Sequence, residues 1–397
     1  MTSEEDAILR LHQAHTGMLD IKTDFDIEDR ADLQKAYTPG VAVLSRMIAE
    51  KPELKDKFTV SGKLVALITD GTAVLGLGNV GPAAGLPVIE GKALLYKDLA
   101  NINAIPLAVD QVSPKEIIKT IKNISLSFAG IHLEDIAAPR CFEIENALSE
   151  ELDIPVYHDD QEGSAIVVLA GLINAAKVVG KKLTDLRVVI NGVGASGLAT
   201  ARLLYAAGIK HLTLVDVHGV ITSEDYRAND YQRVFAAKLG TPQRMENQNI
   251  HDAIKGQDAF IGLSTGNVIN RHDVKQMNEQ PIIFALANPH QEIAPEKAKE
   301  AGAAVIATGS SQYPNQVNNI LAFPGLFKGL LASGLKKVDM DLQKAVAQAL
   351  ASVVAEPTAE NIVPSVFDER VVPTVAKAVV DYASQNKKES SYGKSHC

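Results

Sequence analysis

Residues 187–197 have the sequence RVVINGVGASG, in which an apolar run is followed by three glycines spaced as G-x-G-x-x-G. The apolar run predicts a buried strand, and the alanine-rich stretch at 198–207 predicts a helix behind the glycines. A second apolar run, residues 212–215, ends in Asp216, 19 residues past the last glycine. Glycines in such a turn let a pyrophosphate approach the helix N-terminus, and an acid ending the next strand suits a ribose hydroxyl. This unit predicts a dinucleotide site made by Gly192, Gly194, Ala195, Ser196, Gly197 and Asp216.

The alternation of strands and helices continues toward the C-terminus. Short apolar runs at residues 259–263, 282–287 and 305–308 predict buried strands, and helical stretches lie between them. Such alternation is typical of a doubly wound parallel sheet. We therefore predict an α/β fold, with a C-terminal Rossmann-like doubly wound parallel sheet, an N-terminal α/β domain, and helices at the C-terminal end.

The N-terminal half has a strand pattern of its own. Three apolar runs and a short extended piece predict strands at residues 64–69, 104–109, 125–133 and 154–157. Asp70-Gly71 predicts a hairpin turn into residues 73–77. A second G-x-G-x-x-G, residues 76–81, is not interpreted as a dinucleotide site, because Pro82 and Pro87 interrupt the helix that should follow.

The length of 397 residues predicts two domains. We place a catalytic and metal-binding domain at 1–162, a dinucleotide-binding domain with the C-terminal helices at 163–385, and a flexible polar tail at 386–397.

The net charge of −9, without a basic cluster, argues against nucleic acid or an anionic membrane as partner. No apolar run is long enough to cross a bilayer, the first residues lack the core of a signal peptide, and two cysteines cannot form a disulfide framework. These features predict a cytoplasmic protein.

Two pairs of adjacent carboxylates follow predicted strands, namely Glu134-Asp135 and Asp159-Asp160. One interpretation is that such acids only cap the start of a helix in solvent. However, ligands of α/β sheets collect at the carboxyl ends of strands, and a cation would relieve the repulsion between neighbouring acids. Oxygen ligands without cysteine suit Mg²⁺ or Mn²⁺ rather than zinc. Two such pairs favour a divalent-metal site.

The order of these motifs resembles the small bacterial type of malic enzyme over nearly the whole chain. The matching segments are, in chain order, residues 37–42 (YTPGVA), 69–81, 91–96 (GKALLY), 134–135, 158–163 (HDDQEG), 192–197, 286–289 (LANP) and 318–325. The resemblance implies an NAD(P)-dependent malate dehydrogenase (oxaloacetate-decarboxylating). Such an enzyme converts (S)-malate to pyruvate and CO₂, with decarboxylation of oxaloacetate as a partial activity.

The resemblance also implies the ligands of the metal. Glu134, Asp135 and Asp160 would bind Mg²⁺ or Mn²⁺. Asp159 would stand beside them in the catalytic site as a supporting residue.

The remaining roles implied by the resemblance concern protons and the substrate. Lys92 would be the general base and Tyr37 the general acid that protonates C3 of enolpyruvate. A lysine can act as a base near neutral pH only if its pKa falls below about 10.4, which we expect burial and the cation to achieve. Asn288 and Asn318 would bind the substrate carboxylates.

Several alternatives stay open at the level of the sequence. Asp216 favours NAD, because it would repel the 2′-phosphate of NADP, but Lys210, Arg202 or His218 nearby would soften this preference. The resemblance implies a homodimer, and Tyr37 and Lys92 would act either in one chain's site or across two chains. The competing functions are malolactic conversion of malate to lactate, an amino-acid dehydrogenase of similar plan, and a non-catalytic NAD-sensing regulator.

Overall fold

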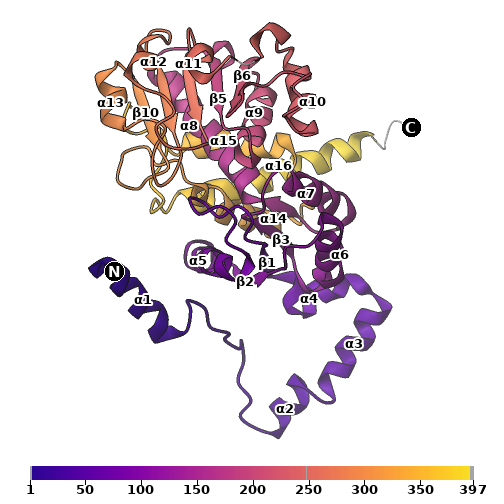
Figure 1. Cartoon of the computed structure of the whole chain (residues 1–397). Helices are drawn as coiled ribbons and strands as arrows, with labels where there is room; N and C mark the ends of the chain where they lie inside the picture. Colours follow the sequence, from indigo (N-terminus) through magenta and orange to yellow (C-terminus); the bar gives the residue numbers. More distant parts are fainter. Residues whose placement is uncertain (1, 247, 394–397) are drawn as a thin grey trace.

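The computed structural model describes residues 2–246 and 248–393, which contain two sheets (Figure 1). The first is parallel throughout, in the order β2-β1-β3-β4, with β1 Leu64–Thr69, β2 Asn103–Ala108, β3 Gly130–Glu134 and β4 Val156–His158. The second has the order β10-β9-β8-β5-β6-β7, with β5 Arg187–Asn191, β6 His211–Asp216, β7 Gly219–Val220, β8 Ala259–Gly262, β9 Ile282–Ala285 and β10 Val305–Thr308. Among these described strands, the β6–β7 pair alone is antiparallel. The predicted α/β fold with a C-terminal Rossmann-like sheet is confirmed.

Helices connect the strands and cover the sheets. Around the first sheet they are α4 Lys55–Phe58, α5 Pro82–Ala100, α6 Pro114–Ile124 and α7 Arg140–Glu151. Helix α8, Ser164–Val178, leads from the first sheet to the second. Around the second sheet they are α9 Ala195–Ala206, α10 Asp230–Leu239, α11 Ile250–Ala253, α12 Arg271–Lys275 and α13 Pro295–Glu300. The chain continues through α14 Phe323–Ser333, α15 Met340–Ser352 and α16 Val371–Gly393.

The hairpin predicted after β1 is wrong. Strand β1 is flanked by parallel β2 and β3 on its two sides, so no edge is left for an antiparallel partner. The segment after β1 is instead tied to the loop after β3, because Ala73 N–H donates to the carbonyl of Asp135 at 2.9 Å and Ala137 N–H donates to the Thr72 hydroxyl at 2.9 Å. This contact brings the ends of two neighbouring strands together.

The expectation that two prolines interrupt the helix after residues 76–81 is also wrong. Helix α5 begins at Pro82, where a missing N–H costs nothing, and it continues past Pro87 to Ala100. The predicted strand at 125–133 is shorter than expected, since β3 starts only at Gly130. Helix α5 matters for the site because it carries Lys92 on a buried face.

Helix α14 belongs to the C-terminal part of the chain but packs against the N-terminal sheet. The rings of Phe323 and Phe327 lie 4.9 and 5.5 Å from that of Tyr96 on α5. On its other side α14 meets α16, where Gly325 and Gly329 face Val375 and Val379 with no room for a Cβ. One apolar core therefore runs continuously from the first sheet into the second.

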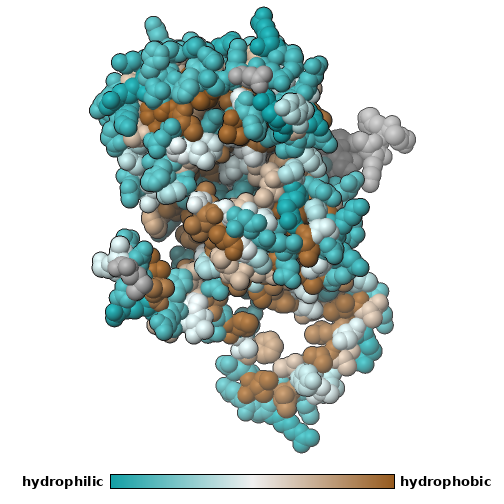
Figure 2. All heavy atoms as spheres, in the orientation of Figure 1, coloured by the Kyte–Doolittle hydropathy of each residue, from teal (hydrophilic) through white to brown (hydrophobic). Residues whose placement is uncertain are grey.

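The N-terminal arm, residues 2–50, stands away from this body (Figure 1). It contains α1 Ser3–His15, α2 Arg30–Ala36 and α3 Gly40–Glu50, and none of its residues is buried. It touches the body where Met18 N–H donates to Glu90 of α5 at 3.3 Å. Apolar side chains nevertheless lie along it (Figure 2), including Ile21, Phe25 and Leu33.

Two positions of the predicted domain plan, the boundary between its domains and the start of its tail, can be located on this fold. The boundary predicted between residues 162 and 163 falls inside a turn of π-helix, η4 Asp159–Gly163. The predicted tail, residues 386–397, starts within α16, whose helical backbone extends to Gly393. Residues 394–397 of that tail lie outside the described part of the chain. Within the described residues, no helix combines the length and apolarity needed to cross a membrane.

Candidate active site

The four predicted carboxylates converge at the carboxyl ends of β3 and β4. Glu134 ends β3, Asp135 follows it with a left-handed backbone (φ 55°), and Asp159 and Asp160 begin η4 after β4. Because β3 and β4 are adjacent and parallel, their last residues reach the same edge of the sheet. Oxygens of Glu134, Asp135 and Asp160 lie within 4.8 Å of one another. The backbone N–H of Asp135 donates to Asp160 Oδ2 at 3.0 Å, which fixes the two segments together.

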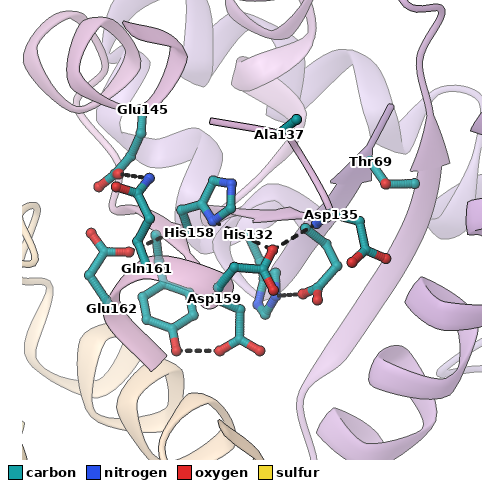
Figure 3. Close-up of polar contacts among 12 residues, drawn as sticks. Thr69, His132, Asp135, Ala137, Glu145, His158, Asp159, Gln161 and Glu162 are labelled. Atoms are coloured by element: carbon teal, nitrogen blue, oxygen red, sulfur yellow. Dashed lines mark hydrogen bonds and ion pairs between the residues drawn. The ribbon is translucent and has the colours of Figure 1, made fainter. Parts of the chain in front are cut away.

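The turn of η4 is held by its own polar side chains (Figure 3). The backbone N–H of His158 donates to Glu162 at 2.7 Å, and the Gln161 amide donates to Glu145 of α7 at 2.6 Å. The turn also requires Gly163, since a Cβ there would lie 2.1 Å from Asp159 Oδ1. These contacts aim Asp159 and Asp160 into the site.

This donor set fits a divalent cation. Oδ2 of Asp135 is buried and has no hydrogen-bond partner. Burial, followed by repulsion from Asp160, raises the pKa of Asp135 to about 7, and burial also raises the pKa of Glu134. Three acids that disfavour one another's charge, and that offer only oxygen, match the preference of Mg²⁺ or Mn²⁺.

A second group, His132, Glu134 and Asp159, also has the spacing of a metal site. Here, however, the ammonium of Lys92 already forms ion pairs with both carboxylates, 2.8 Å from Glu134 Oε2 and in direct contact with Asp159. A cation at this position would meet the lysine charge. The group Glu134, Asp135 and Asp160 is therefore the better candidate.

Lys92 is buried among these carboxylates. Its ammonium lies 5.1 Å from the centre of the Phe323 ring on α14, so three parts of the chain meet around it. Burial alone would lower the pKa of Lys92, but the charges of Asp159, Glu134 and Asp160 outweigh burial and raise it. The neighbouring side chains therefore raise the pKa of Lys92, whereas the sequence analysis expected burial and the cation to lower it.

Asp159 contacts Lys92 directly and is fully buried. Its other oxygen accepts a hydrogen bond from the hydroxyl of Tyr157 on β4. Asp159 therefore holds the lysine in place, a closer role than that of a general supporting neighbour.

Tyr37 is not brought to this cluster within its own chain. It directly follows α2 on the N-terminal arm, and 66% of its surface is exposed. Lys92, by contrast, lies on α5 within the body (Figure 1). Of the two residues predicted to move protons, only Lys92 stands beside the acidic cluster of the same chain.

The two predicted substrate-binding asparagines lie on segments that border the first sheet's site. Asn288 follows β9, and its carbonyl lies 3.4 Å from the position that a Cβ on Gly76 would take, so it faces the loop after β1. Asn318 begins the short turn η7 Asn319–Leu321, where its side-chain oxygen accepts from Ile320 N–H at 3.0 Å. Turn η7 packs against η4, which carries Asp159 and Asp160.

The predicted dinucleotide turn has the expected build. It joins β5 to α9, which begins at Ala195, so Gly192, Gly194, Ala195, Ser196 and Gly197 all lie at the helix start. A Cβ on Gly197 would lie 1.8 Å from the carbonyl of Gly192, so only glycine permits this close packing. Asp216 ends β6, the neighbour of β5, and its carboxylate accepts from the N–H of His218 at 2.8 Å.

Two family models match the chain. One, described as "Malic enzyme, N-terminal domain", covers residues 21–116, and the other, "Malic enzyme, NAD binding domain", covers residues 161–384. The chain belongs to the malic enzyme family. The resemblance inferred from the motifs is thereby confirmed, and so is the prediction of an enzyme of this class.

Curated members of the malic enzyme family are similar over most of their length. The NAD-dependent malic enzyme of Geobacillus stearothermophilus is 47% identical over 369 residues, which are 92% of this chain and 77% of that protein. The bifunctional malic/malolactic enzyme of Bacillus subtilis is 43% identical over 387 residues, 97% of this chain and 94% of that protein. The NADP-dependent malic enzyme of Halomonas elongata is 42% identical over 388 residues, covering 92% and 90%.

Solved structures of malic enzymes share the fold. The NAD-dependent malic enzyme of Thermotoga maritima superposes with a TM-score of 0.90 at 42% identity, covering 94% of this chain and 98% of that one. The malic enzyme of Pyrococcus horikoshii gives a TM-score of 0.92 at 41% identity, covering 96% and 91%. The family assignment thus rests on sequence and fold together.

Two residues at this malic enzyme site were missed by the sequence reasoning. Tyr96 and His132 are both buried, and they link α5 to Glu134 through hydrogen bonds of 2.9 and 2.8 Å. A weak indication exists in the sequence, since Tyr96 lies four residues after Lys92 and His132 two residues before Glu134. The spacing alone does not show that the two meet.

Proposed function

We propose that this member of the malic enzyme family oxidises malate with NAD and decarboxylates the product to pyruvate and CO₂, in a reaction that needs Mg²⁺ or Mn²⁺. The observation that carries the proposal is the pairing of buried Lys92 with Glu134 and Asp159, directly beside the Glu134, Asp135 and Asp160 cluster. A base and an oxygen-ligand site for a cation at one edge of a sheet match the needs of this chemistry. Decarboxylation of added oxaloacetate follows as a partial activity.

Lys92 accepts the proton of the C2 hydroxyl of malate, and NAD, held at the Gly192–Gly197 turn, would supply the acceptor for the hydride of C2. Its two acidic partners hold the amine where that hydroxyl binds, and Asp159 is itself held by Tyr157. A cation held by Glu134, Asp135 and Asp160 would supply positive charge that offsets these acids and stabilises negative charge on the substrate oxygen. Asn288 and Asn318 bind the substrate carboxylates with neutral amide groups.

The preference for NAD rests on Asp216, which would repel a 2′-phosphate. Two of the cations that would soften this preference are engaged elsewhere. Lys210 donates to the carbonyl of Tyr205 at 2.7 Å and lies over its ring. The guanidinium of Arg202 lies over the rings of Phe142 and Tyr231, 5.7 and 5.9 Å from their centres.

The proposed role of Tyr37 as general acid requires a second copy of the chain. The N-terminal arm that carries it buries none of its residues in its own chain and exposes apolar side chains such as Ile21 and Phe25, 90% and 67% exposed. Apolar surface of this extent is typical of segments that pack against a partner. We infer a homodimer in which the arm of one copy supplies Tyr37 to the Lys92 site of the other.

The test is an assay of malate-dependent cofactor reduction by the full chain, with NAD and NADP in parallel. Reduced NAD and pyruvate should form with Mn²⁺, and both should cease when a chelator is added. Undiminished turnover after chelation would contradict the metal assignment. Binding of NAD with no turnover of malate or oxaloacetate would favour a non-catalytic regulator.

A second candidate function is conversion of malate to lactate. It is favoured by the similarity to the Bacillus subtilis relative, which is a bifunctional malic/malolactic enzyme. The same assay distinguishes the two, because a malolactic reaction forms lactate without net release of reduced cofactor. Lactate as the main product would overturn the first proposal.

A further inference from the structure

Tyr96 and His132 form a buried chain of hydrogen bonds that ends at Glu134 and that the proposed mechanism does not use. The Tyr96 hydroxyl lies 2.9 Å from Nδ1 of His132, and Nε2 of His132 lies 2.8 Å from Oε2 of Glu134. The side chains of Tyr96 and His132 have no exposed surface. The chain thus reaches from the core to a carboxylate that is both a proposed cation ligand and the partner of Lys92.

The spacing of helix and strand explains why these groups meet in pairs. Lys92 and Tyr96 are four residues apart on α5, which places them on one face about 6 Å apart along the helix. His132 and Glu134 are two residues apart on β3, on one face about 6.6 Å apart. With these matched spacings, Tyr96 faces His132 while Lys92 faces Glu134.

The imidazole of His132 is enclosed by aromatic rings. Tyr96, Tyr157, Phe323 and Phe327 lie with their ring centres 5.7, 5.3, 5.6 and 6.1 Å from it. These rings come from α5, β4 and α14. Packing on several sides keeps the imidazole from turning away from Glu134.

We propose that His132 is a positioning residue for the cation site, with its Nε2–H directed at Glu134 and its Nδ1 accepting from the Tyr96 hydroxyl. An ionised carboxylate only accepts hydrogen bonds, so Nε2 carries the proton while Glu134 is ionised in its pair with Lys92. A neutral imidazole then accepts at Nδ1, and Tyr96 is the donor that selects this tautomer. The inference rests on the proposed function, because it takes Glu134 to be a cation ligand.

The consequence for the metal concerns the second oxygen of Glu134. Both the imidazole and the ammonium of Lys92 contact Oε2, which leaves Oε1 available to a cation. Loss of the imidazole frees the carboxylate to turn between its partners. Hydrogen-bond partners of a ligating carboxylate typically affect metal affinity by about 10 to 100-fold.

The first test measures Mn²⁺ binding to the full chain without substrate, by the electron paramagnetic resonance signal of free Mn²⁺. His132→Leu removes the donor and should weaken binding by about 10 to 100-fold. His132→Gln places an amide N–H close to the position of Nε2 and should recover most of the affinity. Phe327→Leu opens one side of the aromatic enclosure but leaves Tyr96, Tyr157 and Phe323 in place, so it should lower the melting temperature and weaken Mn²⁺ binding far less than His132→Leu.

The second test observes the tautomer directly in metal-free protein, by ¹⁵N NMR of histidine-labelled chain. The His132 signal, identified by its loss in His132→Gln, should show a proton on Nε2 and none on Nδ1. Tyr96→Phe deletes only the hydroxyl and should introduce the Nδ1-protonated form. The same variant should weaken Mn²⁺ binding by less than the histidine replacement, because one neutral hydrogen bond is lost one step further from the carboxylate.

Several results would overturn the proposal. They are unchanged Mn²⁺ affinity in folded His132→Leu, a wild-type imidazole protonated on Nδ1, or nitrogen coupling to bound Mn²⁺, which would make His132 a ligand. Failure of the wild-type chain to bind Mn²⁺ would instead contradict the proposed function. The two failures are distinguishable, because the tautomer measurement needs no metal and still shows whether His132 donates to Glu134.

Discussion

Nζ of Lys92 lies 2.8 Å from Oε2 of Glu134, so the proposed base is joined by an ion pair to a proposed cation ligand. Asp159 pairs with the same ammonium. Burial by itself would lower the pKa of Lys92, yet Asp159, Glu134 and Asp160 raise it. The readiness of Lys92 to accept a proton therefore depends on the charge of the neighbouring cluster.

Lys92→Ala should lose most of kcat for malate oxidation, about 10² to 10⁴-fold, because it removes the group that accepts the hydroxyl proton. Mn²⁺ binding should persist in this variant and become tighter, since a positive charge has left the acidic cluster. Steady-state rates and Mn²⁺ titrations measure the two effects. Malate oxidation near the wild-type rate would refute the role of Lys92.

Asp159→Asn should move the rising limb of the pH–rate profile to lower pH. The substitution removes the negative charge that most strongly raises the pKa of Lys92, so the amine loses its proton at lower pH. The measurement is kcat/KM against pH at saturating Mn²⁺. Asp216→Asn, at the end of β6, serves as the control and should leave the limb in place; a limb that does not move in Asp159→Asn would show that Lys92 is not the group titrating.

The stability of metal-free protein should fall as pH rises from about 4 to about 7. Burial and Asp160 raise the pKa of Asp135 to about 7 in the folded chain, against about 3.9 when unfolded. Within this window the folded chain retains a proton that the unfolded chain has released, so raising the pH favours unfolding. Urea unfolding with a chelator present should show a shallower pH dependence in Asp135→Asn. Equal slopes in variant and wild type would argue against this assignment.

A mixture of inactive Lys92→Ala and Tyr37→Phe chains should regain activity if Tyr37 acts across the dimer. In a mixed dimer one site then combines the intact lysine of one chain with the intact tyrosine of the other. Random pairing of equal amounts should restore about a quarter of the wild-type activity. The control mixes each variant with itself after the same dissociation and reassociation step. Absence of any recovery, with mixed dimers demonstrated by native mass spectrometry, would place both residues in the same chain's site.

Asp216→Ser should shift cofactor preference from NAD toward NADP, because the repulsion between its carboxylate and a 2′-phosphate is removed. The ratio of kcat/KM values for the two cofactors measures the change. Melting temperature without cofactor provides the control for folding, since within the described chain the Asp216 side chain bonds only locally, to His218 N–H. An unchanged ratio would mean that another residue sets the preference.

Much of the fold could be predicted because the deciding features are local. The turn at Gly192–Gly197 needs glycine because its own backbone approaches closely. The strand before it and the helix after it can each be recognised from the pattern of a few neighbouring residues. The convergence of Glu134 and Asp160 was also predictable, since parallel neighbouring strands deliver their last residues to one edge. The hairpin after β1 failed for the opposite reason: whether a strand has a free edge depends on strands far along the chain.

The sequence by itself determined the class of fold, the dinucleotide turn, the acidic cluster and the family, because each depends on short-range order or on strand ends that share an edge. Tertiary structure alone decided three other matters. It separated Tyr37 from Lys92 by placing them on the arm and the body, it surrounded Lys92 with charges from several segments that raise its pKa, and it set the register of α5 on β3 that joins Tyr96 to His132. Each of these depends on contacts between segments that are far apart in the sequence. Such contacts cannot be inferred from the residues of one segment.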